Sequence, residues 1–230
     1  MSTEVKTFFD HRAEIFDSLY QGNPVASRWN RIVRKALYDR FAIALDAAGE
    51  ARGKSVLDVG CGSGRYMTAL ARAGAGPLVG IDVAPEMIAL ARKLTAAEGL
   101  GGRCRFIEGD FLQTELDGSF DVVLAMGVFD YVEDPLPFLR KMAGTSSGLV
   151  VASFPGRSLV RMRLRSFRYR CRNCPVFFYR EPDLHALCRA AGLEDYDLVF
   201  MPASGTGWVL VGRTGTRPPG PGTTGPGRIG

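Results

Sequence analysis

The sequence predicts an α/β fold in which helices cover both faces of a mostly parallel sheet. Short β-branched apolar runs alternate with helical patterns from residue 54 to residue 155, as in chains that form parallel sheets. These runs are almost continuously apolar, so both faces of the sheet should be buried. The 230 residues are 46% hydrophobic and 23% charged, which fits a soluble globular domain with a sizeable core.

The elements follow from the spacing of apolar residues along the chain. Residues 4–50 carry apolar side chains at three- and four-residue intervals and predict helices, with a break at 21–24. Helices are also predicted at 65–73, 85–98, 135–142 and 182–191. Seven strands are predicted at 55–60, 77–83, 104–110, 120–127, 148–154, 194–203 and 207–213. The last two strands should form a closing antiparallel pair.

We expect one domain over residues 1–213. Its parts are a helical segment at 1–50, a core at 54–155, an arginine-rich insertion at 156–180, and a closing helix and strands at 181–213. The remaining residues, 214–230, are rich in Gly and Pro and hold one large apolar side chain. Such a composition cannot bury a core, so we expect a disordered tail.

The net charge of +5 is concentrated in one segment. Eight arginines and no acidic residue lie between Arg157 and Arg180, so the rest of the chain is net acidic. Such a segment provides a surface that can bind anions. Its target could be an acidic small substrate, a lipid headgroup surface or RNA, and all three remain open. Interleaved aromatic side chains suit stacking or a headgroup interface. Nucleic acid is disfavoured, because no known RNA-binding module and no DNA-methyltransferase motif is visible.

The sequence favours a cytoplasmic protein without a transmembrane segment. No apolar run reaches the roughly 18–20 residues that cross a bilayer, and the polar N-terminus lacks a signal-peptide core. Five scattered cysteines suit a reducing compartment. The oligomeric state stays open.

A cysteine pair raises the question of a metal. Cys171 and Cys174, with His185 and Cys188, give a C-x2-C-x10-H-x2-C spacing that could hold zinc. Against this, Cys188 occupies a core position of a predicted helix. We therefore expect no metal site.

The stretch VLDVGCGSGRY, residues 56–66, places a glycine loop between a strand and a helix. Gly60, Gly62 and Gly64 allow the backbone to approach a ligand, as in nucleotide-docking loops. The loop lacks the lysine of a P-loop and the last glycine of the dinucleotide fingerprint. Asp58 adds a carboxylate, which is unfavourable beside a phosphate and favourable beside an ammonium or sulfonium.

Two more acids end the following strands. Asp82 lies where a carboxylate can accept hydrogen bonds from ribose hydroxyls, and Asp110 ends the next strand. Turn-forming aspartates are common at strand ends. Three in register with a glycine loop instead indicate one ligand-binding edge.

On these motifs the sequence resembles the class I S-adenosylmethionine-dependent methyltransferases of the small-molecule type. The resemblance is carried by VLDVGCGSG, GIDVAPEMIALAR, FIEGDF and FDVVLAMGVFDYVEDP, within residues 54–155, and extends more weakly to residue 213. It implies a Rossmann-like, doubly wound sheet of seven strands with an antiparallel last strand. It also implies that the helices at 1–50 form a lid over the cofactor, S-adenosylmethionine.

The resemblance also assigns roles to residues. The backbone of Gly60, Cys61 and Gly62 would approach the methionine part of the cofactor, and Asp58 would hold its ammonium. Asp82 would bind the ribose. The remaining cofactor contacts would be Val83 and Met87 on the adenine, Asp110 on its amino group with Phe111 alongside, and the carbonyl of Met126 on the ammonium.

The candidate catalytic residues are Tyr131, Asp130 and His11. Relatives often have a histidine near the place of Tyr131, so histidine-type base catalysis is in doubt there. A tyrosine with an ordinary pKa near 10 is a poor base at neutral pH, although it can contact substrate or simply pack. His11 belongs to the N-terminal helices, where it is a second candidate base or an exposed polar residue.

We therefore expect methyl transfer to a small molecule, at oxygen, which is favoured by base rate. Methyl transfer needs alignment, and a base if the acceptor is protonated. Three alternatives remain. The first is a cofactor-dependent enzyme that does not methylate, such as a cyclase. The second is an RNA methyltransferase, and the third is a non-catalytic cofactor-binding subunit.

Overall fold

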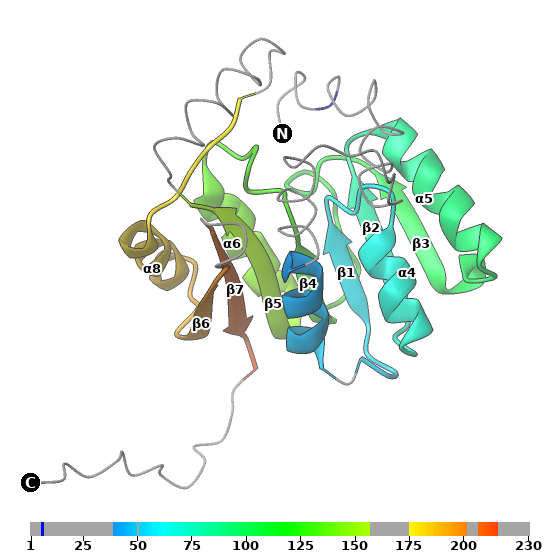
Figure 1. Cartoon of the computed structure of the whole chain (residues 1–230), viewed down its shortest axis with the longest axis horizontal. Helices are drawn as coiled ribbons and strands as arrows, with labels where there is room; N and C mark the ends of the chain where they lie inside the picture. Colours follow the sequence, from blue (N-terminus) through cyan, green and yellow to red (C-terminus); the bar gives the residue numbers. More distant parts are fainter. Residues whose placement is uncertain (1–5, 7–38, 50, 157–174, 202–206, 216–230) are drawn as a thin grey trace, which may run out of the picture.

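The computed structural model describes residues 6, 39–49, 51–156, 175–201 and 207–215. Within them, seven strands form one sheet in the order β3-β2-β1-β4-β5-β7-β6 (Figure 1). The strands are β1 (Val56–Val59), β2 (Leu78–Asp82), β3 (Cys104–Glu108), β4 (Phe120–Ala125), β5 (Ser146–Pro155), β6 (Asp195–Phe200) and β7 (Gly207–Arg213). β7 is antiparallel to both of its neighbours, and the other pairs are parallel. The predicted sheet is confirmed.

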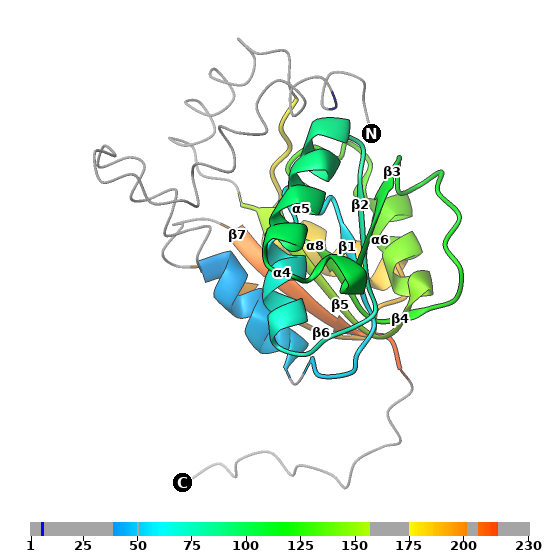
Figure 2. The same cartoon turned by 90° about the vertical axis from the view of Figure 1, so that its right-hand side faces the viewer.

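Helices lie on both faces of the sheet (Figure 2). A helix at residues 39–48 lies on one face with α4 (Arg65–Arg72) and α5 (Pro85–Ala97). α6 (Pro135–Thr145) and α8 (Glu181–Ala190) pack on the other. A short 3-10 helix, η1 (Gly101–Arg103), precedes β3. Among the residues that the structure describes, no helix is long and apolar enough to cross a membrane.

Alternation along the strands builds two separate cores. In β1, Leu57 and Val59 face the cluster under α6 and α8, whereas Val56 faces the cluster under the other three helices. Phe41 joins the second cluster with its ring 4.9 Å from that of Tyr66. Burial on both faces therefore explains the nearly continuous apolar strands seen in the sequence.

The predicted junction between the helix at 135–142 and the fifth strand moves. α6 continues to Thr145 and β5 begins at Ser146, whereas the sequence predicted a helix ending at 142 and a strand beginning at 148. The Thr145 hydroxyl donates a 2.8 Å hydrogen bond to the Lys141 carbonyl and so satisfies the end of the helix. The predicted lid, apart from Lys6 and residues 39–49, lies outside the described residues. So do residues 157–174 of the insertion and 216–230 of the tail.

The glycine loop follows β1 with left-handed backbone at all three glycines. The φ angles of Gly60, Gly62 and Gly64 are +68°, +51° and +75°, a region that costs other residues about 1–2 kcal/mol each. A Cβ on Gly60 would also overlap the Cγ2 atom of Val128. The run of glycines is thus a backbone requirement, and at Gly60 it is a packing requirement too.

Gly60→Ala should therefore lower the free energy of unfolding by about 2–4 kcal/mol, from left-handed strain plus overlap with Val128. The matched control is Gly53→Ala, since Gly53 has φ +74° with nothing within 4 Å of the added Cβ. That control should cost about 1–2 kcal/mol. Urea unfolding of both variants measures the difference, and equal losses would contradict the packing argument.

Candidate functional site

The predicted cofactor residues converge on the carboxyl edge of four neighbouring parallel strands. Asp58 is the third residue of β1, and Asp82 is the last residue of β2. Asp110 lies two residues beyond β3, and Met126 directly follows β4. Because these strands are adjacent and parallel, their ends meet along one rim, which is where open α/β sheets bind ligands.

Asp58 is the most unusual group of this edge. It is 1% exposed, and its Oδ2 atom is buried with no hydrogen-bond partner among the described residues. Burial, and to a smaller extent the nearby charge of Asp82, raise the pKa of Asp58 to about 8. A buried carboxyl without a partner is costly, so this site is suited to a cationic ligand.

Asp82 organises the loop next to it. Its Oδ2 atom accepts a 2.9 Å hydrogen bond from the Gly62 N–H, and its Oδ1 atom accepts one of 2.9 Å from the Ala84 N–H. The carboxylate is only partly buried. Each oxygen has a second lone pair, so the same carboxylate can hold the loop and accept hydrogen bonds from a ligand's hydroxyl groups.

The amide groups of the glycine loop bond mainly to the protein itself. The N–H groups of Gly60 and Cys61 both donate to the Ile81 carbonyl, at 2.8 and 3.1 Å, and that of Gly62 donates to Asp82. Phosphate-docking loops instead point such N–H groups at the anion. With Asp58 and Asp82 alongside, the geometry argues against a phosphate in this loop.

The side chains assigned to the adenine lie around the ends of β2 and β3. Met87 is 4% exposed and packs with Ala84, and Val83 is partly exposed. The Oδ1 atom of Asp110 accepts a 3.0 Å hydrogen bond from the Leu112 N–H. Phe111 is 3% exposed and belongs to the core under α6, with its ring 5.0 Å from that of Phe138.

Lys141 on α6 fixes this turn, and no sequence pattern pointed to this lysine. Its Nζ atom donates to the carbonyls of Phe111, Leu112 and Thr114 at 2.6, 3.2 and 2.7 Å. It also lies 5.0 Å from the centre of the Phe111 ring. The ammonium therefore holds the turn beside Asp110 through long-range contacts that no local motif reports.

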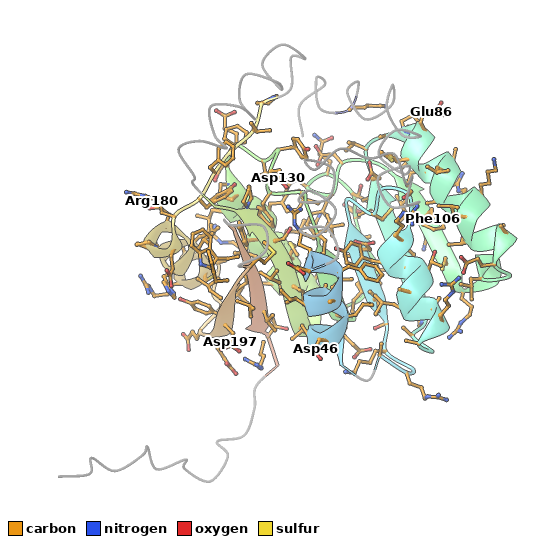
Figure 3. All side chains as sticks on the ribbon, in the orientation of Figure 1. Asp46, Glu86, Phe106, Asp130, Arg180 and Asp197 are labelled. Carbon is orange, nitrogen blue, oxygen red and sulfur yellow. The ribbon has the colours of Figure 1, made fainter. Side chains whose placement is uncertain are left out.

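The loop after β4 carries two of the candidate catalytic residues. Asp130 is 2% exposed and Tyr131 is 8% exposed, and Asp130 lies at the upper edge of the sheet in Figure 3. Arg40, from the helix at 39–48, lies with its Nη1 atom 3.7 Å from Asp130 Oδ2. The carboxylate is thus engaged by a cation that sequence reasoning missed. His11 lies outside the described residues.

The possible zinc ligands do not gather in the described chain. Cys188 is 1% exposed in the core under α8, and burial raises the pKa of its thiol to about 11. The Nδ1 atom of His185 lies 2.7 Å from the Tyr196 hydroxyl. No group of three metal-ligating side chains occurs among the residues that the structure describes, and Cys171 and Cys174 lie outside them.

This combination of a seven-stranded sheet with a reversed β7, a left-handed glycine loop and acids at successive strand ends defines a Rossmann-like methyltransferase fold. Residues 56–145 match the family described as "Methyltransferase domain". The magnesium protoporphyrin IX methyltransferase from Synechocystis PCC 6803 with bound SAH superimposes with a TM-score of 0.73, at 20% identity, over 92% of this chain and 98% of that one. Over residues 56–145 the chain therefore carries a class I S-adenosylmethionine-dependent methyltransferase domain.

The names of two curated relatives give different methylated atoms, nitrogen in one and oxygen in the other. The ajmaline N-methyltransferase of Rauvolfia serpentina is 32% identical over 114 residues, covering 48% of this chain and 39% of that protein. The mitochondrial ubiquinone biosynthesis O-methyltransferase of Schizosaccharomyces pombe is 39% identical over 111 residues, covering 47% and 40%. The chain spans about two fifths of the length of these relatives.

The residues present fit the family's cofactor. S-adenosylmethionine carries an ammonium and a sulfonium, and Asp58 presents a buried carboxyl oxygen without a partner in the described structure. Asp82 lies at the strand end where a ribose is bound in such folds. A cationic ligand matches this edge, since a cation near Asp58 favours its charged form.

The titration of Asp58 predicts a pH-dependent stability. The folded protein keeps Asp58 protonated up to about pH 8, whereas the unfolded chain titrates near 3.8. Stability is therefore lost as pH rises between these values. Asp58→Asn cannot titrate, so its free energy of unfolding relative to wild type should increase from about pH 5 to about pH 8, by up to about 1.4 kcal/mol per pH unit.

Urea unfolding across that range measures the change, with Asp121→Asn as the control. The pKa of Asp121 is lowered chiefly by hydrogen bonds from the Ser55 N–H and hydroxyl. The stability it contributes is lost only as pH falls below its usual range. This control should differ from wild type by a constant amount between about pH 5 and about pH 9. The same constancy in Asp58→Asn would contradict the assignment.

Proposed function

We propose that the chain transfers the methyl group of S-adenosylmethionine to a small-molecule acceptor, at oxygen. The observation that carries the proposal is Asp58, a buried carboxyl with one partnerless oxygen, placed beside Asp82. The resemblance of the core to an O-methyltransferase supports the choice of oxygen. The cofactor supplies an electrophilic methyl group on a positively charged leaving group, so the protein mainly has to bind and align.

In this proposal the cofactor lies along the edge formed by β1 to β4. Asp58 takes the ammonium together with the carbonyl of Met126, and Asp82 takes the ribose hydroxyls. The Gly60–Gly62 backbone lies against the methionine part, and no side chain intervenes at these glycines. The adenine lies among Val83, Met87, Asp110 and Phe111.

The acceptor lies over the loop after β4. Tyr131 contacts or orients the acceptor, and His11 is the candidate base for a protonated oxygen. Asp130 is engaged by Arg40 at 3.7 Å, so we assign it the task of holding this loop and the helix at 39–48 together. The buried pair keeps both charges near the reacting groups without leaving either isolated.

We infer further that the acceptor is anionic or bound at a membrane surface. The arginine-rich insertion supplies the positive charge, and its flanks support a place beside the site. Gly156 forms a bridge with Tyr179, and the Phe177 N–H donates a 2.9 Å hydrogen bond to the Asp130 carbonyl. Both flanks of the insertion therefore meet at the carboxyl edge of β4 and β5.

Incubation with methyl-labelled S-adenosylmethionine and a panel of small acceptors, read by mass spectrometry, tests the function. A labelled product together with S-adenosylhomocysteine supports the proposal. Consumption of an acceptor without label supports chemistry such as cyclisation, and binding without any turnover supports a non-catalytic subunit. Either of the last two results overturns methyl transfer. An RNA arm in the same panel separates the nucleic-acid alternative.

Asp82→Ala should raise the Kd for S-adenosylhomocysteine at least tenfold, about 1.4 kcal/mol, because ribose hydroxyls lose an acceptor. Isothermal titration calorimetry measures the affinity. Asp46→Ala is the control, since Asp46 is exposed and lies toward the opposite edge of the sheet (Figure 3), and its affinity should match wild type. Unchanged affinity in Asp82→Ala would count against the whole site.

Replacing Arg161, Arg163 and Arg165 by Gln should lower kcat/KM for an anionic acceptor about tenfold or more, since an anion loses its partners, while the S-adenosylhomocysteine affinity stays unchanged. The control replaces exposed arginines elsewhere, Arg105 and Arg189, by Gln. That control should leave kcat/KM within about twofold. Equal turnover in all three proteins would show that the insertion does not recognise the acceptor.

A further inference from the structure

The chain that returns from the insertion is bonded to the loop after β4. In residues 175–180, the Phe177 N–H donates to the Asp130 carbonyl at 2.9 Å, and the Tyr179 N–H donates to the Pro155 carbonyl at 2.9 Å. The bridge between Tyr179 and Gly156 extends the edge of β5 by one step. This returning segment therefore lies between the end of β5 and the loop.

The hydroxyl of Tyr179 spans the same loop. Its Oη atom lies 3.2 Å from the Phe129 carbonyl and 3.2 Å from the Val132 carbonyl. With the bond from Phe177 to Asp130, three of the four carbonyls between Phe129 and Val132 face donors from the returning segment. The loop's backbone is therefore shaped by residues that lie far from it in the sequence.

Aromatic packing fixes the tyrosine that makes these contacts. Tyr179 is 9% exposed, and its ring meets Phe154 edge-on with 5.2 Å between centroids. Phe154 in turn stacks on Phe129 at 4.3 Å. Burial, with the charges of Asp130 and Asp134, raises the pKa of Tyr179, so the hydroxyl keeps its proton and remains a donor.

We propose that Tyr179 is a positioning residue for the acceptor side of the site. Its hydroxyl holds the Phe129–Val132 backbone in the one shape that presents Tyr131 to the acceptor and keeps Asp130 beside Arg40. Within the described part of the chain, its hydroxyl and ring contact the loop after β4 and Phe154. The inference rests on the proposed methyl transfer for its catalytic consequence, but its structural half stands on the hydrogen bonds alone.

Tyr179→Phe tests this, because it removes one hydroxyl and keeps the ring. Tyr196→Phe is the matched control, since the Tyr196 hydroxyl bonds His185 on α8, remote from the loop. In Tyr179→Phe, amide hydrogen exchange of a peptide covering 128–133 should become at least about tenfold faster. The Kd for S-adenosylhomocysteine should stay within about twofold of wild type. The control should change neither.

With an acceptor from the labelling screen, Tyr179→Phe should lower kcat about tenfold while the KM for S-adenosylmethionine stays within about twofold. Unchanged exchange in the loop overturns the inference, and so does faster exchange with unchanged kcat. Thermal unfolding midpoints of the two Phe variants that lie within a few degrees of each other establish that both variants are folded. If no acceptor is methylated, the proposed function fails, and the exchange experiment still decides whether Tyr179 holds the loop.

Discussion

The buried carboxyl of Asp58 is the constraint on which the site depends. Its side chain is 1% exposed and faces the charge of Asp82, so two acids lie close together at this edge of the sheet, which is unfavourable. The protein tolerates this by keeping Asp58 protonated and by bonding Asp82 to the Gly62 and Ala84 amides. A ligand that brings positive charge lowers the remaining electrostatic cost of these two acids. Ligand binding and local stability therefore depend on the same interaction.

The two halves of the site are built by different means. On the cofactor side, nearly everything is local: a strand end, a left-handed loop, and a carboxylate that bonds the loop beside it. On the acceptor side, the loop after β4 is held by residues from elsewhere in the chain. Arg40 reaches Asp130 from the helix at 39–48, and Tyr179 reaches the carbonyls on either side.

This division explains what the sequence could predict. Strands and helices followed from apolar periodicity, and all seven predicted strands are present, because the strands of the sheet interior bury apolar residues on both faces. The glycine loop and the acids at strand ends were visible because they are local patterns. Arg40, Lys141 and Tyr179 were not, since each acts on a partner that only the fold brings near. The ion pair of Asp130 was hidden for the same reason.

The cofactor edge of this chain is more sharply defined than its acceptor. The ammonium and sulfonium of the cofactor suit a buried acid beside a bare backbone, and Asp58 and the glycine loop supply both. The names of the relatives, in contrast, give different acceptor atoms. In the function that we propose, the acceptor is met by a loop whose carbonyls accept hydrogen bonds from Phe177 and Tyr179, residues that follow the arginine-rich insertion in the sequence. Since those contacts link the insertion to the loop, a change in the insertion can alter acceptor binding without disturbing Asp58 or Asp82. In the function that we propose, acceptor specificity therefore depends on the contact between β5, the returning segment and the loop after β4.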